Sequence, residues 1–358
     1  MQAVILVGGK GTRLRPLTDT RPKPMMTVVD RPFVTHQLDH LQRHGVTDVV
    51  FSCGYLPDAL RDHFGDGRDR GLSIRYVVDP EPLGTGGAVR NAWPELDPSA
   101  ATLVLNGDVL TDIDLGAVLA RHRERAAAGT IVLTPVADPG PFGLVRLLAD
   151  DSVEAFVEKP APEELRPGEP FRINAGTYVL EPALVQGIPE GEPCSIERDV
   201  FPAVAAQGGL YGHPSDAYWL DIGTPAAYLR ANRDVLAGRV RTDSPVGDAH
   251  LGADVVLGAR ASVGGGSVVG ARCRLGDGAS VAGCVLGDGV RVGSGAELSG
   301  CIVGAGVSVG DGATVGEEVV VGDGAVVAPG ATVEGPVKVP TDGLVDDDGV
   351  RESEHAGR

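Results

Sequence analysis

Apolar and polar positions along the first 240 residues predict strands and helices in turn. Residues 3–7 form an unbroken apolar run, which is typical of a strand buried on both faces. Later segments carry apolar residues at helical spacing, and further apolar runs separate them. The expected strands are 3–7, 46–51, 74–78 and 102–106, and the expected helices are 33–44, 56–64, 86–93 and 226–236. This alternation predicts an α/β fold with a doubly wound, mainly parallel sheet, in which ligands bind beyond the carboxyl ends of the strands.

A different period governs the last third of the chain. From Leu257 an aliphatic residue returns every six positions as far as Val333, and the interval shortens to five only before Leu286 and Val303. Such a period predicts a parallel β-helix in which each hexad forms one face of a triangular coil. Cys284 and Cys301 lie beside the two short intervals, where we expect them to pack inward or at corners. The patterns together predict a domain at 1–240, a β-helix domain at 241–340 and a flexible tail at 341–358.

The turn after the first strand suits a polyphosphate. Its sequence, GGKGTR at residues 8–13, has three glycines in four positions, which allow positive φ and close approach of backbone N–H groups to an anion. Lys10, Arg13, Arg15 and Lys23 add positive charge that suits phosphate. The spacing fits neither a Walker A loop nor a dinucleotide fingerprint. A glycine-rich turn with solvated basic residues is the structural alternative.

The amino-acid composition limits the kinds of molecule that the protein is expected to bind. The net charge of −18 argues against a general nucleic-acid-binding surface, so an anionic substrate needs a local positive patch. Lysine is rare, at four against 27 arginines, and three of the four stand in the strings GGKGT, PKPM and VEKP. The five cysteines include no C-x-x-C pair, and no segment has the length of a membrane helix or of a signal peptide. We therefore expect a cytoplasmic protein with reduced, packed thiols and no membrane or nucleic-acid partner.

Two aspartates and three later polar residues are candidates for chemistry. Asp108 directly follows the strand 102–106, and Asp221 ends a short apolar and aromatic run. Each either holds Mg²⁺ or only begins a turn, and two such acids at one site would form a phosphoryl-transfer metal centre. Farther along, Glu158 and Asn174 suit sugar hydroxyls and Lys159 suits a phosphate, unless all three are edge-strand residues that face water. The eight histidines are scattered, and we expect His36, His40 and His44 to be surface or packing residues.

Taken together, these motifs resemble the sugar-phosphate nucleotidylyltransferases, also called nucleoside-diphosphate-sugar pyrophosphorylases. The matching strings run in order from residue 2 to about residue 236 and are GGKGTRLRPLT, RPKPM, EPLGTGGAV, NGD, FGLV, VEKP, INAGTYV, SIERDVFP and YWLDIGTP. Among the branches of the family, EPLGTGG, SIERDVFP and YWLDIGTP look like mannose-1-phosphate guanylyltransferases, although that branch more often has Ala where Gly86 stands. The C-terminal repeats resemble the left-handed β-helix of the hexapeptide-repeat family. The resemblance thus implies a Rossmann-like mixed sheet followed by a left-handed parallel β-helix.

The resemblance also implies roles for individual residues. Arg13, Lys23, Asp108 and Asp221 would be catalytic, and the two aspartates would hold Mg²⁺. The nucleotide would contact Leu6, Gly8, Gly9, Gly11, Thr12, Arg13, Glu81, Gly84, Thr85 and Gly87. The sugar phosphate would contact Gly143, Glu158, Lys159, Asn174 and Thr177.

The implied reaction is an in-line attack by a sugar 1-phosphate on the α-phosphorus of an NTP, with release of pyrophosphate. A phosphate monoester is anionic at neutral pH, with a second pKa of about 6, so no strong general base is needed. GTP and mannose 1-phosphate are the expected substrates. Glucose 1-phosphate or a cyclitol phosphate with dTTP or UTP is the alternative, and a non-catalytic nucleotide-sugar sensor is a rival of another class.

Two roles are open for the β-helix. It either supports oligomerisation and a lid or regulatory surface, or it is a second enzyme, an acyltransferase. Such transferases usually need a base, and the only histidine in or beside the repeats is His250. We therefore expect the structural role and a homo-oligomer.

Overall fold

The computed structural model describes residues 1–54, 56–165 and 171–352, and contacts divide the chain into two compact units. The first unit contains Met1–Lys10 and Gln37–Trp219, and the second contains Gly11–His36 and Leu220–Arg358. The chain therefore passes between the units inside the glycine-rich turn, inside helix α1 (Phe33–Arg43) and after Trp219. The expected domain boundaries after residues 240 and 340 stay predictions.

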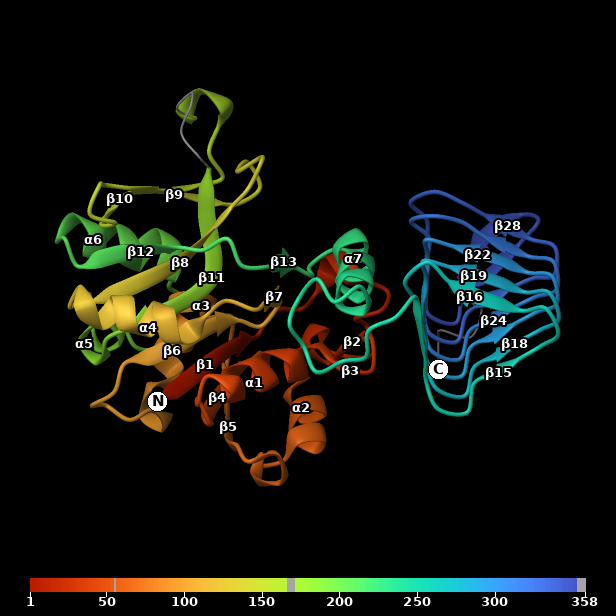
Figure 1. The fold of residues 1–358 in the computed structure, drawn as a ribbon, viewed down its shortest axis with the longest axis horizontal. Helices are drawn as coiled ribbons and strands as arrows, with labels where there is room; N and C mark the ends of the chain where they lie inside the picture. Colours follow the sequence, from red (N-terminus) through yellow and green to blue (C-terminus); the bar gives the residue numbers. More distant parts are fainter. Residues whose placement is uncertain (55, 166–170, 353–358) are drawn as a thin grey trace. The chain divides into compact units, whose positions relative to one another are not determined.

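A nine-stranded mixed sheet is the centre of the first unit (Figure 1). In its parallel part β1 lies between β6 and β4, and β5 follows β4. Strand β11 adds antiparallel to β6 and also pairs with β8 and β9. The strands are β1 (Gln2–Val7), β4 (Asp48–Cys53), β5 (Ser73–Val78), β6 (Thr102–Asn106), β8 (Gly129–Pro135), β9 (Gly143–Leu147), β10 (Val153–Glu158), β11 (Arg172–Leu180) and β12 (Leu210–Pro214). The predicted Rossmann-like mixed sheet is confirmed.

Short helices cover this sheet and supply part of its core. Val4, Val50 and Val104 lie on the three central strands and pack in one buried cluster with Val89 and Ala92 of α3. The sheet side chains are fully buried, which explains why the central strands appear in the sequence as unbroken apolar runs. The α-helices that lie wholly in this unit are α2 (Pro57–Phe64), α3 (Gly84–Ala92), α4 (Leu115–Glu124), α5 (Pro182–Gln186) and α6 (Phe201–Ala206).

Helix α1 contains two of the three histidines of this region, and both are buried packing residues. His36 and His40 are almost fully buried, whereas His44 is partly exposed. Burial lowers the pKa of His40 from 6.5 to about 4, and the nearby positive charges of His44 and Arg43 lower it further, while Asp112 and a hydrogen bond to the backbone of Ile113 oppose them.

We expect acid to destabilise the fold through His40. The unfolded chain takes up the proton near pH 6.5 and the folded chain only near pH 4, so the free energy of unfolding falls as the pH drops through this range. The loss is at most about 3 kcal/mol. Urea unfolding at pH 7 and pH 4.5 measures it, and His40→Gln is expected to reduce the difference. An equal pH dependence in the variant would contradict the assignment.

The second unit consists of a parallel β-helix, helix α7 and the segment 11–36. Helix α7 (Pro225–Leu236) begins where the Thr224 hydroxyl accepts a hydrogen bond from Ala227 N at 3.2 Å, with Pro225 in the first turn. Asn232 of this helix accepts a hydrogen bond from Val29 N at 2.8 Å, next to the short pair β2 (Thr27–Val28) and β3 (Arg31–Pro32). These contacts attach the segment 11–36 to α7.

The β-helix has three parallel sheets, so that every third strand belongs to the same face (Figure 1). One face holds β14 (Ala249–Leu251), β17 (Ser267–Val269), β20 (Val285–Leu286), β23 (Ile302–Val303), β26 (Val320–Val321) and β29 (Lys338–Val339). The next holds β15 (Val256–Leu257), β18 (Arg274–Leu275), β21 (Arg291–Val292), β24 (Ser308–Val309), β27 (Val326–Val327), β30 (Leu344–Asp346) and β31 (Gly349–Arg351). The third holds β16 (Ser262–Gly264), β19 (Ser280–Ala282), β22 (Glu297–Ser299), β25 (Thr314–Val315) and β28 (Thr332–Val333). The predicted left-handed β-helix is confirmed.

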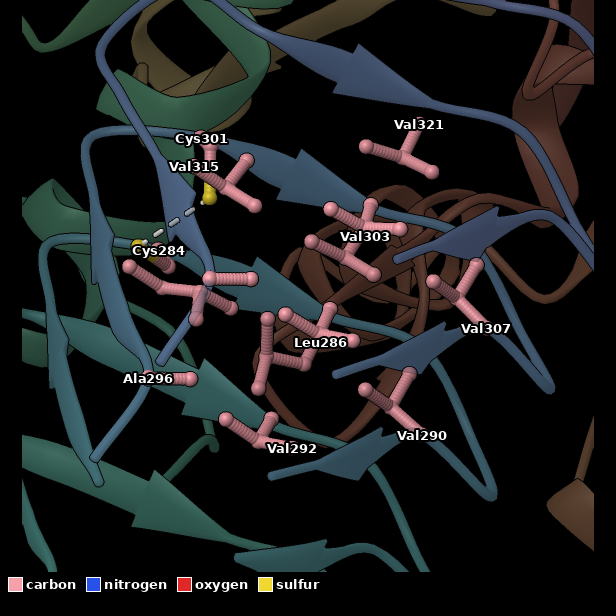
Figure 2. Packing of buried hydrophobic residues seen from close by; sticks show 14 of the residues in the cluster. Cys284, Leu286, Val290, Val292, Ala296, Cys301, Val303, Val307, Val315 and Val321 are labelled. Atoms are coloured by element: carbon pink, nitrogen blue, oxygen red, sulfur yellow. Dashed lines mark hydrogen bonds between the residues drawn. The ribbon is translucent and has the colours of Figure 1, made fainter. Parts of the chain in front are cut away.

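The six-residue aliphatic period fills the inside of this coil. Figure 2 shows Leu286, Val292 and Val303 pointing into one packed cluster, and all three are buried. Cys284 and Cys301 are also fully buried there, with sulfur atoms 3.5 Å apart, so the expectation that they pack inward is confirmed.

Removing side-chain volume from this interior is expected to cost stability. Val303→Ala deletes two methyl groups from a fully packed site and should lower the free energy of unfolding by about 2 kcal/mol. Val326→Ala, on an outward position that is 43% exposed, is the matched control and should change it by less than about 0.5 kcal/mol. Chemical denaturation of both variants tests this, and equal losses would argue against an interior role for the repeat.

The C-terminal residues differ from the expected tail. The six-residue period continues at Val339 and Val345, which are both buried, and β30 pairs with β31 in an antiparallel hairpin. The period was missed because the glycines that mark earlier corners give way to Pro340-Thr341 and Asp346-Asp347. Residues 341–352 therefore do not form a tail without regular structure, and 353–358 lie outside the described residues. No helix in the described ranges is long and apolar enough to span a bilayer.

Candidate functional site

In the first unit, two neighbouring chain segments approach the end of β1 closely. A Cβ at Gly54 would lie 2.8 Å from the carbonyl oxygen of Gly8, and one at Gly107 would lie 2.5 Å from that of Leu6. Both positions thus need glycine for steric reasons. Gly107 N also donates to Leu6 O at 2.9 Å, so the predicted metal ligand Asp108 follows a residue that is fixed against β1, the strand that leads into Gly8 and Gly9.

The EPLGTGG segment packs its glycines against residues 192–197. Gly84 has a φ of +70°, and a Cβ there would lie 2.6 Å from Cys194 O. The amides of Gly86 and Gly87 donate to the same carbonyl at 2.9 and 3.1 Å. A Cβ at Gly86 would meet Cys194 Sγ at 3.1 Å, which gives a steric reason for the departure noted at this position. Glu81 precedes this packed region and is exposed.

Glu197 connects the predicted nucleotide and sugar segments, although the sequence analysis did not single it out. Its carboxylate accepts hydrogen bonds from Thr85 Oγ1 at 2.6 Å, Ser195 Oγ at 2.8 Å and the Tyr178 hydroxyl at 3.1 Å. Tyr178 in turn accepts from Asn174 Nδ2 at 2.8 Å. Burial raises the pKa of Tyr178 well above its usual value, with the Glu197 carboxylate adding to the effect, so the phenol stays protonated and able to donate. The only sequence signal was the position of Glu197 inside the string SIERDVFP.

The predicted sugar-phosphate residues lie on three strands of the first unit or directly after one. Gly143 begins β9 opposite Glu158, the last residue of β10, whose side chain lies outside what the structure describes. Lys159 follows with a φ of +51°, an unusual value for a residue other than glycine, and its side chain is exposed. The register of β11 shifts between Asn174 and Tyr178, and Thr177 within the shift is buried.

Trp219 is a second residue missed by the sequence analysis. Its indole N–H donates to Ala175 O at 2.9 Å, and its ring meets Phe142 edge to face at a centroid distance of 5.6 Å. Phe142 O also accepts from Lys159 N at 2.9 Å. Trp219 therefore fixes the irregular part of β11 and the backbone around Lys159 in one arrangement. Its signal was the string YWLDIGTP, of which only the aspartate was selected.

In the second unit, the glycine-rich turn continues into a 3-10 helix at Thr12–Leu14. Gly11 precedes it in a left-handed conformation with a φ of +62°. The Thr18 hydroxyl donates to Gly11 O at 2.9 Å. A side chain at Gly11 would press on Thr18 and on Lys23 Cβ, at 3.1 and 3.3 Å. The turn that presents Thr12 and Arg13 is thus packed closely on the RPKPM segment.

Three predicted catalytic residues of the second unit converge. The carboxylate of Asp221 has Lys23 Nζ 3.7 Å from one oxygen and Arg13 Nη2 3.8 Å from the other. Gly223 N donates to Asp221 Oδ1 at 2.7 Å, which orients the carboxylate. A Cβ at Gly223 would lie 2.3 Å from Arg13 Nη2, so a larger residue at this position would displace the guanidinium from the Asp221 carboxylate. Lys23 is almost buried whereas the Arg13 side chain is 63% exposed, so the arginine is the more accessible of the two cations.

The cysteines of the chain are packed in its interior. All five cysteines are free and buried, and burial raises the pKa of Cys53 to about 12. No group of three or more His, Cys, Asp or Glu side chains in the described ranges could hold a metal ion. Mg²⁺ often takes only one or two carboxylates and completes its shell with substrate oxygens and water, so such a site needs no group of three.

Two family models match the chain. A nucleotidyl transferase model matches residues 2–238, and a model described as the GMPPB C-terminal domain matches residues 246–348. The first match contains every residue predicted for the site, and the second covers the described β-helix as far as β30.

Named relatives agree with these matches. The chain is 41% identical to the mannose-1-phosphate guanylyltransferase of Mycobacterium tuberculosis over 80% of its own length and 79% of that protein. It is 36% identical to the probable mannose-1-phosphate guanylyltransferase 3 of Oryza sativa subsp. japonica, over 80% and 78%. Among solved structures, HddC from Yersinia pseudotuberculosis is similar with a TM-score of 0.56 and 29% identity, over 64% of this chain and 97% of that one. A structure of HddC complexed with GMP-PN has a TM-score of 0.54 at the same identity and coverage.

Proposed function

Because the chain belongs to the nucleotidyl transferase family, we propose that it transfers a guanylyl group from GTP to mannose 1-phosphate and releases pyrophosphate. One structural observation carries the proposal: Arg13, the last residue of the glycine-rich turn, and Lys23 both lie within 4 Å of the Asp221 carboxylate. Cations and a carboxylate in this arrangement suit a triphosphate with a bound cation. The choice of mannose and guanine follows the names of the relatives.

In the proposed reaction, an oxygen of the sugar 1-phosphate attacks the α-phosphorus of GTP. The new P–O bond forms as the bond from the α-phosphorus to the bridging oxygen of the β-phosphate breaks, and pyrophosphate leaves with the electron pair. The nucleophile is already anionic, so no side chain has to remove a proton. Alignment of the two phosphates and neutralisation of their charge then supply most of the rate acceleration.

We assign the triphosphate to the turn at residues 8–13. The backbone amides of Gly8, Gly9 and Gly11 are expected to donate to phosphate oxygens, and the exposed guanidinium of Arg13 to bind the leaving pyrophosphate. Lys23 is expected to neutralise the α-phosphate, because its buried ammonium is a compact charge with little freedom to move.

Mg²⁺ is the expected cofactor, held by Asp108 and Asp221. The Asp221 carboxylate fits this role because Gly223 N orients it and because oxygen is the ligand that Mg²⁺ prefers. When bound, the ion would neutralise phosphate oxygens and help to align them. Arg13 and Lys23 offset the charge of Asp221, and both cations would be available to phosphate if that carboxylate held Mg²⁺.

The acceptor is expected to bind along β9, β10 and β11. Lys159 would pair with the phosphate of the sugar, while Glu158, Asn174 and Thr177 would contact its hydroxyls beside Gly143. The bond from Asn174 to Tyr178 and from Tyr178 to Glu197 holds this amide in place. The base and ribose are assigned to Glu81, Gly84, Thr85 and Gly87.

A matrix of four NTPs against several hexose 1-phosphates, read as pyrophosphate release, tests the proposal. We expect the highest kcat/KM with GTP and mannose 1-phosphate, and loss of activity when EDTA removes divalent metal. Higher activity with dTTP or UTP and glucose 1-phosphate would replace the substrate assignment. No release with any pair would favour a non-catalytic sensor.

Three expectations from the sequence remain proposals. We place the protein in the cytoplasm, because its five cysteines are free. We propose a homo-oligomer, which light scattering of the full chain would test. We also propose a supporting rather than an acyl-transferring role for the β-helix, and consumption of acetyl-CoA with a sugar-phosphate acceptor would overturn it.

A further inference from the structure

Two side chains of the β-helix hydrogen-bond to the segment that carries Arg13 and Lys23. Lys338 Nζ, on β29, donates to the carbonyl oxygen of Arg13 at 2.9 Å. Asp323 Oδ2, at the corner before β27, accepts from Thr20 Oγ1 at 2.8 Å and from Arg21 Nη2 at 3.2 Å. All of these residues belong to the second unit. The last coils of the β-helix thus contact the segment at two points, one on each side of the cis Arg15-Pro16 bond.

Asp323 is one of four aspartates that repeat along the β-helix. In each, Oδ1 accepts a hydrogen bond from a backbone amide of the preceding coil, at 2.7 to 2.9 Å; the aspartates are Asp277, Asp288, Asp311 and Asp323. This shared bond closes a corner and accounts for the repetition. Asp323 differs because its second oxygen binds Thr20 and Arg21, 303 and 302 residues away in the sequence. The repeat does not require that second contact.

Lys338 also departs from a repeat. The outward position of this β-helix face is aliphatic and almost fully buried in the four preceding coils; these residues are Val268, Val285, Ile302 and Val320. Lys338 pairs with Val320 in the same register. In the coil that follows these four, a lysine therefore stands where the earlier coils have an aliphatic residue. It is the only lysine of the β-helix, and its ammonium reaches the backbone of a proposed catalytic residue.

We propose that Lys338 and Asp323 are positioning residues for the triphosphate-binding turn. The inference rests on the proposed function. Arg13 lies in a single turn of 3-10 helix whose first residue follows a left-handed glycine, so few intrahelical bonds restrain its backbone. A charge-assisted bond to the Arg13 carbonyl and a clamp on Arg21 restrain it from two sides. The β-helix thereby fixes the backbone from which Arg13 reaches the nucleotide.

A purely structural role predicts a different result from a positioning role. If the two contacts only attach the segment to the β-helix, their loss lowers thermal stability and leaves the kinetic constants of the folded enzyme unchanged. If they position the turn, their loss weakens NTP binding selectively and leaves the KM for the sugar 1-phosphate unchanged. Catalysis depends steeply on such placement, because small displacements of a catalytic group lower the rate.

The experiment compares Lys338→Met and Asp323→Asn with two matched controls in the full chain. Methionine keeps the length of the lysine stem and removes its charge, and asparagine keeps the Oδ1 acceptor and removes the charge that binds Arg21. Asp311→Asn is the control at the equivalent corner, where Oδ1 accepts from Ser294 N at 2.7 Å. Lys338→Arg restores a cation at the other site.

We expect the KM for the NTP and its dissociation constant, measured calorimetrically without sugar phosphate, to rise about tenfold in each test variant. Asp311→Asn should match the wild type, and Lys338→Arg should recover most of the loss. Test variants that bind NTP like Asp311→Asn would overturn the inference while leaving the proposed function intact. A wild type that neither binds NTP nor releases pyrophosphate would overturn both.

Discussion

Asp221→Asn is expected to lower the turnover number for pyrophosphate release by about 100-fold to 1,000-fold. The substitution removes the negative charge that pairs with Lys23 and Arg13 and with which we expect Mg²⁺ to bind. Asparagine can still accept the Gly223 amide, so the local backbone stays in place. The protein should therefore lose little stability, about 1 kcal/mol or less, because the ion pairs are partly solvated.

The same loss is expected for Asp108→Asn, which removes the second proposed ligand. Steady-state pyrophosphate release over a range of Mg²⁺ concentrations measures both variants, and half-saturation should need more Mg²⁺ in each. Asp216→Asn is the matched control, since this aspartate is exposed and only five residues from Asp221. Near-normal turnover and Mg²⁺ dependence in both test variants would remove the metal assignment.

Glu197→Ala is expected to damage both stability and turnover. The carboxylate accepts three hydroxyl hydrogen bonds, and its loss leaves the fully buried Tyr178 hydroxyl without its acceptor. Buried polar groups that lose a partner cost about 1 to 3 kcal/mol each, so we expect a total loss of about 3 to 4 kcal/mol. Thr85 and Asn174 also lose their common support, which should lower kcat/KM by about 10-fold to 100-fold.

Urea unfolding and steady-state kinetics of the full chain test this prediction. Glu197→Gln keeps the shape and one acceptor oxygen, so its effects should lie between those of the wild type and Glu197→Ala. Glu192→Ala is the control in the same segment, because the Glu192 side chain is exposed and Gly87 approaches only its backbone carbonyl. Should Glu197→Ala behave like Glu192→Ala, the carboxylate would have no connecting role.

The elements expected from the sequence agree best with the structure where a local pattern of apolar residues can be buried in only one way. The run at residues 3–7 became β1 because an unbroken apolar segment of that length has to be buried on both faces. The aliphatic period from Leu257 became the interior of the β-helix for a similar reason, since stacked hexads bury their aliphatic residues in one continuous core. The period still ran two repeats farther than expected, to Val339 and Val345, because its corners changed composition.

Residues whose contacts lie far away in the sequence could not be identified from the sequence alone. Glu197 meets Thr85 across 112 positions, and Lys338 meets Arg13 across 325. A glutamate in a polar string and a lysine in a repeat have no local feature that distinguishes them from solvated charges. Lys338 stands in line with the aliphatic outward residues Val285, Ile302 and Val320. That it departs from this column can be seen only once the three faces of the coil are known.

The sequence alone determined the sheet, the β-helix and the family resemblance. The reason is that buried strands, glycine turns and phosphate-binding charges can each be recognised in a short stretch of sequence. The sequence also selected Arg13, Lys23 and Asp221, which the structure brings within ion-pair distance in the second unit. Tertiary structure decided which polar residues support the candidate site within each unit. In the first unit Glu197 bonds to Thr85 and Trp219 bonds to the backbone of β11, and in the second Asp323 and Lys338 bond to the segment that carries Arg13. The reason is that a hydrogen bond between distant segments depends on where the whole chain places its donor and acceptor, which no local pattern records.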